Sequence, residues 1–245
     1  MSDKFRLFLT GAVALVAVGV TVAAPAPWSL FHFNDDEEEQ AVIPLTSLKD
    51  FDGITLEGPD DVVVTQGDSF AVTLDGDKDA ARHLNLYVRD GVLHVGRRGG
   101  QWRGDTTVRV TMPGLSRIAL VGSGDMQVEK MDGKAFSALV TGSGDLQVDE
   151  VISDNVALTL RGSGDVAMEG TTKALGVNLF GSGDIRLEGL SAQTADITLR
   201  GSGSVQAHAT GSAKLDITGS GDAHVSGTTQ CQISKVGSGD AECTT

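Results

Sequence analysis

The sequence contains few aromatic residues, prolines and cysteines. Phenylalanine, tryptophan and tyrosine make up 4% of the 245 residues, and there are five prolines and two cysteines. A groove of stacked aromatic rings, such as sugar-binding proteins often use, is therefore not expected. The composition instead suits a narrow interior whose corners are formed by glycine, of which there are 32.

The sequence also contains few basic residues. The 19 lysines and arginines are outnumbered by 33 acids, which gives a net charge of −14. Residues 1–24 hold two basic residues and one acid, so the remainder carries −15. Nucleic acid and anionic lipid surfaces are therefore disfavoured as partners.

Histidines are few and have no metal-ligand spacing, so we expect them to be surface or loop residues. The serines of the repeats described below have no histidine nearby in the repeat to act as a base, which argues against a serine nucleophile. We therefore predict no catalytic residue, no cofactor and no metal site. The histidines are His32, His83, His94, His208 and His224.

One tetrapeptide, Gly-Ser-Gly-Asp, recurs through the second half of the chain at intervals of 18 to 20 residues, once as Gly-Ser-Gly-Ser. A repeat of this length indicates one supersecondary unit that stacks on itself. We expect the first glycine of each copy to form a coil corner. These glycines are Gly122, Gly142, Gly162, Gly181, Gly201, Gly219 and Gly237.

The residues around each corner alternate between apolar and polar, as strands do. After Asp145 come Leu146, Gln147 and Val148. The second, fourth and sixth residues are apolar before the corner glycines Gly142, Gly162, Gly181, Gly201 and Gly219. Two short strands with one apolar face each cannot bury that face alone. Successive units must therefore stack on one another. The pattern predicts an all-β fold, a parallel β-solenoid of about eight coils.

Residues 43–121 are β-rich but less regular. Gly58-Pro59-Asp60-Asp61, flanked by alternating apolar residues, repeats the corner in degenerate form and predicts the first coil. Further predictions are strands at 70–74 and 107–112, a hairpin at 86–95 with an Asp-Gly turn, and a helical turn or two at 77–84. Such excursions would cover the open end of the solenoid.

The N-terminus has the layout of an export segment. Lys4 and Arg6 precede an apolar run over residues 7–24, which is followed by prolines. Its 18 residues fit either a cleaved signal peptide or an uncleaved anchor in the inner membrane. No cysteine follows the run, so a lipoprotein is not expected. We divide the chain into this segment (1–24), an acidic linker (25–41) and the solenoid domain (42–245).

The order of these elements resembles a known bacterial family, the putative auto-transporter adhesin, head GIN domain. The resemblance rests on Phe51-Asp52-Gly53-Ile54, the Gly58 corner, the 92–95 strand, Met112-Pro113-Gly114-Leu115 and the serial Gly-Ser-Gly-Asp corners, and it covers residues 42–245. It implies an exported, right-handed β-helix-like domain. The family name suggests adhesion.

The aspartates of the repeats are expected to form one row, with neighbours about 4.8 Å apart. The repulsion between neighbouring carboxylates, on the order of 1 kcal/mol per pair in water, must be offset by another interaction. Each aspartate could accept hydrogen bonds from its own glycine corner, or the row could bind calcium. Ser204 interrupts the row, which favours the first account and predicts that folding needs no calcium. The row contains Asp125, Asp145, Asp165, Asp184, Asp222 and Asp240.

The two cysteines, Cys231 and Cys243, are predicted to form a disulfide. An exported chain meets oxidising conditions. Both cysteines also occupy inward-facing positions of the final coil, where Ala213 and Val225 stand in the preceding coil. The bridge would pin the C-terminal edge.

Three functions remain open. The sequence favours a non-catalytic, adhesin-like interaction module in the periplasm, anchored to the envelope or on the surface of a bacterium, whose ligand is unknown. A polysaccharide-acting β-helix enzyme would need paired carboxylates in a groove beneath residues 97–104. A self-assembling envelope scaffold would be favoured by an uncapped last coil. Membrane contact is expected only through an uncleaved N-terminal segment.

Overall fold

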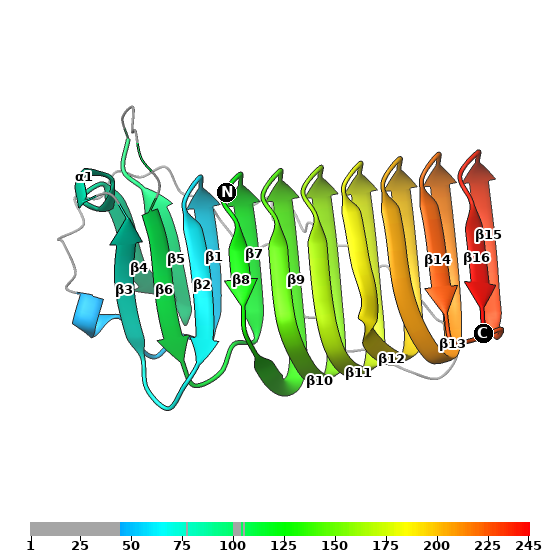
Figure 1. Ribbon diagram of the computed structural model, residues 1–245, viewed down its shortest axis with the longest axis horizontal. Helices are drawn as coiled ribbons and strands as arrows, with labels where there is room; N and C mark the ends of the chain where they lie inside the picture. Colours follow the sequence, from blue (N-terminus) through cyan, green and yellow to red (C-terminus); the bar gives the residue numbers. More distant parts are fainter. Residues whose placement is uncertain (1–44, 77, 100–103, 105) are drawn as a thin grey trace, which may run out of the picture. The chain divides into compact units, whose positions relative to one another are not determined.

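The described part of the chain is an all-β parallel solenoid (Figure 1). The computed structural model describes residues 45–76, 78–99, 104 and 106–245. Its strands belong to one 16-stranded sheet, and most neighbours pair in parallel, as the repeats predict. Over these residues, no helix combines the length and the apolar character needed to cross a membrane.

Each repeat contributes a strand before its corner and a strand after it. The strands of the regular stack are β7 (Arg117–Gly122), β8 (Met126–Val128), β9 (Met131–Gly142), β10 (Leu146–Gly162), β11 (Val166–Gly181), β12 (Asp184–Gly201), β13 (Ser204–Gly219), β14 (Asp222–Ser226), β15 (Cys231–Gly237) and β16 (Ala241–Thr244). In β10 to β13 the strand after one corner runs without interruption into the strand before the next. These strands therefore bend around the core (Figure 1).

Equivalent residues of successive turns lie in register. Leu158 pairs with Val177, Val177 with Ile197, and Ile197 with Leu215, and all four side chains are buried. The core is thus a column of stacked aliphatic rows at the strand spacing of about 4.8 Å. Such rows leave little room for rings, which accounts for the scarcity of aromatic residues.

The glycine corners stack so closely that side chains would collide with the preceding turn. Gly162 has a φ of 140°, and a Cβ added there would overlap the backbone carbonyl oxygen of Gly142. A Cβ added at Gly164 would overlap the carbonyl oxygen of Gly144. Both glycines of the corner are therefore required, the first for its backbone conformation and its close approach, the second for its close approach.

The N-terminal strands cover one end of the stack. They are β1 (Gly53–Gly58), β2 (Asp61–Gln66), β3 (Ala71–Gly76), β4 (Leu84–Arg89), β5 (Val92–Arg97) and β6 (Thr106–Met112), with the 3-10 helix η2 (Leu45–Ser47) and the single helical turn α1 (Lys78–Ala81). Strands β1 and β2 form the first coil, because they pair with β7 and β8 and place Gly58 in register with Gly122.

The layers beyond the first coil reverse direction. Strands β5 and β6 pair in parallel with β1 and β2, and β4 and β3 then pair with them in antiparallel orientation. Figure 1 shows this arrangement at the blue-green end of the sheet. The excursion therefore caps the solenoid, as the sequence predicted.

The predicted hairpin is also confirmed. It consists of β4 and β5, joined by Asp90 (φ 52°) and Gly91 (φ 73°). Two consecutive residues with positive φ are what a two-residue hairpin turn of this kind requires. The helical turn expected at 77–84 is confirmed as α1, which is only four residues long.

The solenoid has about six turns, fewer than the eight coils predicted. The seven corners from Gly122 to Gly237 enclose six turns, because a turn runs from one corner to the next. The eighth corner, Gly58, is in register with them, but the chain leaves the stack after β2 and returns only at β7. Counting every corner as a coil therefore overstated the number of turns.

Candidate interaction surfaces

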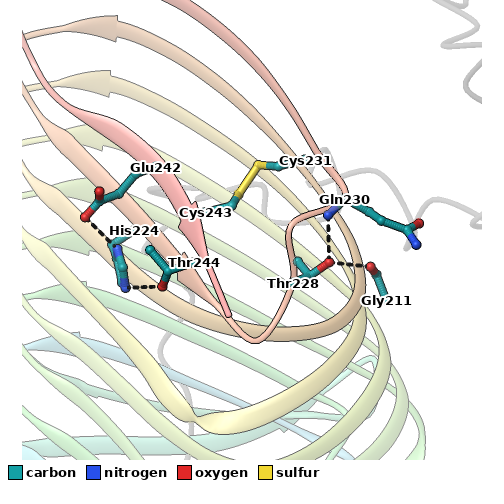
Figure 2. Close-up of a disulfide and its surroundings, with 8 residues drawn as sticks. All are labelled: Gly211, His224, Thr228, Gln230, Cys231, Glu242, Cys243 and Thr244. Carbon is teal, nitrogen blue, oxygen red and sulfur yellow. Dashed lines mark hydrogen bonds and ion pairs between the residues drawn. A yellow bond between two sulfur atoms is a disulfide. The ribbon is translucent and has the colours of Figure 1, made fainter.

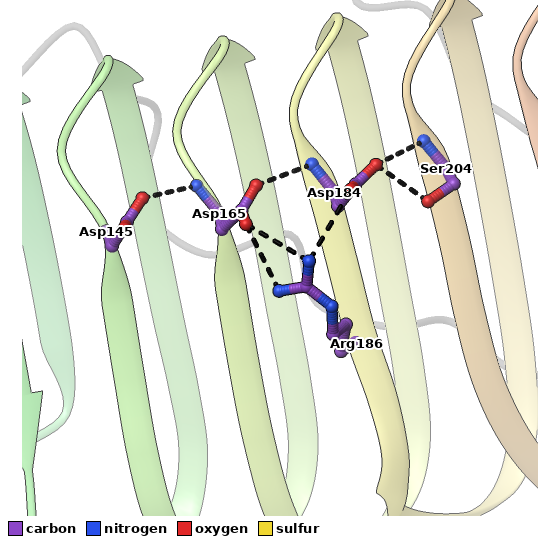
Figure 3. Close-up of polar contacts among 5 residues, drawn as sticks. All are labelled: Asp145, Asp165, Asp184, Arg186 and Ser204. Carbon is purple, nitrogen blue, oxygen red and sulfur yellow. Dashed lines mark hydrogen bonds and ion pairs between the residues drawn. The ribbon is translucent and has the colours of Figure 1, made fainter.

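The aspartate row runs along the corner edge and links each turn to the next (Figure 3). Oδ1 of Asp145 accepts a hydrogen bond from the backbone N–H of Asp165 at 2.7 Å, and Oδ1 of Asp165 accepts one from Asp184 at 3.1 Å. Other neighbours in the row repeat the contact. The hydrogen-bond role predicted for these side chains is right, but the partner is the next turn rather than the aspartate's own corner.

Arg186 offsets part of the repulsion within this row. Its guanidinium lies 3.1 Å from Oδ2 of Asp165 and 3.5 Å from Oδ2 of Asp184 (Figure 3). One arginine on the strand after the corner thus bridges two neighbouring carboxylates. All three side chains are partly exposed, so solvent screens the pairs and each is worth about 0–1 kcal/mol.

Ser204 interrupts the ladder, which resumes between Asp222 and Asp240, for a simple chemical reason. Oδ1 of Asp184 accepts hydrogen bonds from both the backbone N–H and the hydroxyl of Ser204, at 3.2 and 2.7 Å. Serine has no carboxylate to extend the pattern, and the N–H of Asp222 donates to the carbonyl oxygen of Gly203 instead. Within the described ranges, no group of three or more His, Cys, Asp or Glu side chains is placed to hold a metal ion.

The strands after the corners carry a second acidic column beside the aspartate row. Its members stand four positions after the row residue of the same turn and are exposed. They are Glu129, Asp149, Glu169 and Glu188. We call the two columns together the acidic face.

The strands before the corners present a different surface. Phe180, one residue before its corner, lies between Arg161 and Arg200 of the neighbouring turns. The guanidinium carbon is 4.9 Å from the ring centroid for Arg161 and 5.9 Å for Arg200, which is the geometry of cation–π contacts. The parallel row on the same face holds Thr159, Asn178 and Thr198 in register. These six residues form what we call the arginine face.

The last coil is held by a disulfide between Cys231 and Cys243 (Figure 2). Their Cα atoms are 6.3 Å apart, and the cysteines pair in register with Ala213 and Val225. The bridge therefore joins β15 to β16 across the inward-facing positions of the final turn.

The same coil departs from the apolar ladder at Lys235. This residue pairs in register with the buried Ile217, yet its ammonium donates a hydrogen bond to the carbonyl oxygen of Gly239 at 2.7 Å. Ile233, which pairs in register with the buried Leu215, is 46% exposed, and the outward-facing Val236 is 68% exposed. The C-terminal end thus presents both an inward lysine and exposed apolar side chains.

The N-terminal end contains a buried ion pair. The guanidinium of Arg97 binds Asp60 through two hydrogen bonds of 2.5 and 2.6 Å, and both side chains are nearly inaccessible to solvent. Asp60 stands where later corners have their second glycine, because Gly124 packs against its carbonyl. Sequence reasoning missed the pair, although an acid in a glycine position of the first corner was a visible signal.

Three of the described histidines are on strands, and none of the described histidines belongs to a group of three or more potential metal ligands. The ring of His94 stacks on Tyr87, with centroids 4.7 Å apart. Nδ1 of His208 lies 3.0 Å from the hydroxyl of Ser226, and His224 lies 3.0 Å from Glu242. Burial raises the pKa of Tyr87, and the nearby charge of Glu57 raises it further.

Several sequence-based expectations fall outside the described residues. These are the export segment 1–24, the acidic linker 25–41 and His32.

Comparisons with solved structures place the fold among putative adhesins. A putative adhesin from Bacteroides fragilis superposes with a TM-score of 0.76 at 21% identity, over 80% of this chain and 93% of that one. A putative adhesin from Parabacteroides distasonis gives 0.64 at 22% identity, over 80% and 93%. A protein from the same species, described as a putative lipid binding protein, gives 0.60 at 21%, also over 80% and 93%. At these identities the likeness concerns the fold alone.

No curated protein matches the sequence. One family model does, over residues 50–229, which is well over half of the chain. The match includes the degenerate first corner, the antiparallel end layer and the corners up to Gly219. The chain therefore belongs to the family described as putative auto-transporter adhesin, head GIN domain.

Proposed function

We propose that this protein is a non-catalytic interaction module, exported to the envelope or surface of a bacterium, that binds other molecules through the sides of its solenoid. One observation carries the proposal: the inward rows stay apolar from turn to turn, whereas an outward row beside the repeated aspartate row changes from turn to turn. The second residue after the row aspartate, or after Ser204 in its place, faces outward and is Gln147, Ala167, Arg186, Gln206 and His224 in successive turns.

The inward neighbours of these residues are uniformly apolar. They are Leu146, Val166, Ile185, Val205 and Ala223, and all are buried. A constant core with a varied surface is the arrangement of repeat proteins that use their extended faces for binding. The fold therefore serves as a rigid frame for side chains whose identity changes along its length.

The polar side chains of the corners have structural partners, which supports a binding rather than a catalytic role. The aspartate row accepts backbone hydrogen bonds, and Arg186 bridges two of its members. Family membership supports adhesion, since the family is described as the head domain of an adhesin.

Export is supported by independent features. Residues 1–24 have the charge and apolar pattern of a signal peptide or an uncleaved membrane anchor, and residues 25–41 form an acidic linker. The Cys231–Cys243 bridge is typical of chains that fold in an oxidising compartment. Periplasmic, envelope-anchored and surface locations all agree with these features.

The test is to incubate the purified protein with bacterial envelope glycans and to measure binding and cleavage together. Binding that saturates, without release of shorter glycan fragments, is the expected result. Fragment release that increases with time would show a polysaccharide-acting enzyme and overturn the proposal.

A second candidate function, self-assembly into an envelope scaffold, is favoured by the C-terminal coil. Among the described strands, β15 pairs only with β13 and β16 only with β14, so each has one open edge. Ile233 and Val236 add exposed apolar surface there. Sedimentation over a range of concentrations distinguishes the two: a binding module remains one species, whereas a scaffold grows into long assemblies.

A further inference from the structure

Arg161 and Arg200, the two cations of the arginine face, have no acidic partner among the residues that the structure describes. Most other arginines that the structure describes bind a carboxylate. These arginines are Arg89, Arg97, Arg109, Arg117 and Arg186. Arg161 and Arg200 contact the ring of Phe180 instead, and no carboxylate among the described residues lies within ion-pair distance of either.

Phe180 holds these two arginines in a fixed arrangement. Register places one guanidinium on each neighbouring turn, so the two charges are two strand spacings apart, about 10 Å. A guanidinium that stacks on a ring by its flat face keeps its N–H edge available. That edge binds a carboxylate, sulfate or phosphate through two parallel hydrogen bonds.

The neighbouring row supplies uncharged hydrogen-bonding groups. Thr159, Asn178 and Thr198 lie two residues before the Arg–Phe–Arg row on the same three strands. Their side-chain oxygens and nitrogen make no hydrogen bond to any residue that the structure describes. Each of these side chains is at least partly exposed. A ligand rich in hydroxyl groups would find both donors and acceptors beside the two cations.

The acids on this side of the solenoid are partly neutralised. Asp216 accepts a hydrogen bond of 2.6 Å from the ammonium of Lys214, and this contact raises the pKa of that lysine. The charge of Asp196 raises it further. The columns of the acidic face stand on the strands after the corners, whereas the arginine face stands on the strands before them.

We infer that the arginine face binds an acidic polysaccharide, with Arg161 and Arg200 each receiving a carboxylate and the Thr–Asn–Thr row binding its hydroxyl groups. This inference rests on the proposed function and names the chemical class of ligand for it. Polymers suit the site because the two cations are too far apart for one small anion to bind both.

Other polyanions fit this surface less well. Stable attachment to an anionic membrane through charge takes a cluster of four to eight basic residues or an inserted apolar group. The arginine face has two arginines, and the exposed apolar side chain that continues their row, Val236, stands two turns beyond Arg200. Nucleic acid binding rests on many phosphate contacts, which two arginines do not offer.

The experiment measures binding of polygalacturonate, an acidic polysaccharide, to the full chain by titration calorimetry. We expect saturable binding that weakens at least about tenfold in Arg161→Gln/Arg200→Gln, since each substitution removes a charged hydrogen-bonding group. Phe180→Leu keeps both charges but removes the ring, so it is expected to weaken binding by a smaller factor. Neutral dextran is expected to bind none of these proteins.

The matched control is Lys130→Gln/Lys173→Gln. It changes the net charge by the same amount, but both lysines are already paired, with Glu150 and Asp154. Near-unchanged binding of this control supports the inference. An equal loss of affinity in both double variants would overturn it, because net charge would then explain the result. Equal binding of dextran would also overturn it, because binding would then be non-specific.

Two further measurements distinguish this inference from a lipid-binding site and from the proposed function. If vesicles containing phosphatidylglycerol bind through Arg161 and Arg200 while polygalacturonate does not, the surface is a lipid site and the inference is wrong. If polygalacturonate fails to bind but envelope glycans still do, the inference is wrong and the proposed function stands. Failure with every envelope glycan contradicts both.

Discussion

The two ends of the solenoid are closed in different ways. At the N-terminal end the chain adds two further layers, and the outermost strands, β3 and β4, run antiparallel to their neighbours. At the C-terminal end no layer is added within the described chain, and the last coil is instead held by the Cys231–Cys243 disulfide. One end is closed by folding back, the other by a covalent bond.

This contrast appears at single positions of the repeat. The second glycine of a corner becomes Asp60 at the N-terminal end, where its carboxylate receives Arg97. The buried aliphatic ladder becomes Lys235 at the C-terminal end. An inward-pointing charge is a recognised way of preventing edge-to-edge pairing of sheets. A repeat position that holds the same type of residue in every central turn can therefore hold a different type at the ends of the stack, where it has another role.

Breaking the buried ion pair should have the largest effect. Asp60→Asn removes the carboxylate that accepts two hydrogen bonds from the buried Arg97 guanidinium, and we expect the free energy of unfolding to fall by about 3–5 kcal/mol. Asp75→Asn is the control, because Asp75 pairs with Arg109 on the exposed surface of the same end, where a pair contributes about 0–1 kcal/mol. Equilibrium denaturation in urea measures both. Similar losses in the two variants would show that burial of the pair is unimportant.

Removing the disulfide should have the next largest effect. The bond closes a separation of 12 residues, and its loss in Cys231→Ala/Cys243→Ala is expected to lower the free energy of unfolding by about 2–3 kcal/mol. Reduced wild-type protein is the matched comparison and should behave like the variant. Urea curves that coincide for all three proteins would contradict a stabilising bridge.

Replacing the inward lysine should change association more than stability. Lys235→Leu restores the aliphatic ladder at an open edge, so we expect new dimers or larger assemblies in analytical ultracentrifugation. Lys173→Leu is the control, since that lysine is 66% exposed on the side of the stack, away from the open edge. A Lys235→Leu protein that sediments like wild type would mean that the lysine does not protect this edge.

The smallest effect is spectroscopic and concerns the N-terminal end. Tyr87 is the only tyrosine, so absorbance at alkaline pH reports its ionisation alone. Burial disfavours the phenolate, which places the midpoint above 10. The folded pKa is raised, so the stabilising contribution is complete below pH 10 and is lost as the pH rises through the folded pKa.

Substitution of Glu57 separates the two causes of the raised pKa of Tyr87, burial and the charge of Glu57. Glu57→Gln should lower the midpoint slightly, because burial is the larger cause and the charge the smaller one. A midpoint at the ordinary value in wild type, or no change in Glu57→Gln, would contradict this account of the N-terminal layer.

The sequence predicts the regular part of the fold well because each residue there faces nearly the same neighbours as its counterpart one turn away. The apolar rows and the glycine corners follow directly from that repetition. The layer order of β3 to β6 was not predictable, because pairing between strands far apart in the chain leaves no periodic signal. The Arg97–Asp60 pair depends on that order and was missed with it.

The candidate surfaces were predictable only in part. The position of the aspartate row follows from the repeat, but its partner in the next turn depends on the offset between turns, which only the structure gives. Arg161, Phe180 and Arg200 each stand one residue before a corner glycine, so their register could be read from the sequence. That the two arginines lack carboxylate partners required side-chain positions.

Hydrogen exchange, followed by mass spectrometry in the oxidised and reduced protein, tests the difference between the two ends most directly. If the ends are closed independently, reduction should remove protection from the amides of β15 and β16 and leave β3 to β6 as protected as before. Loss of protection along the whole chain, or no change in the last coil, would contradict the account.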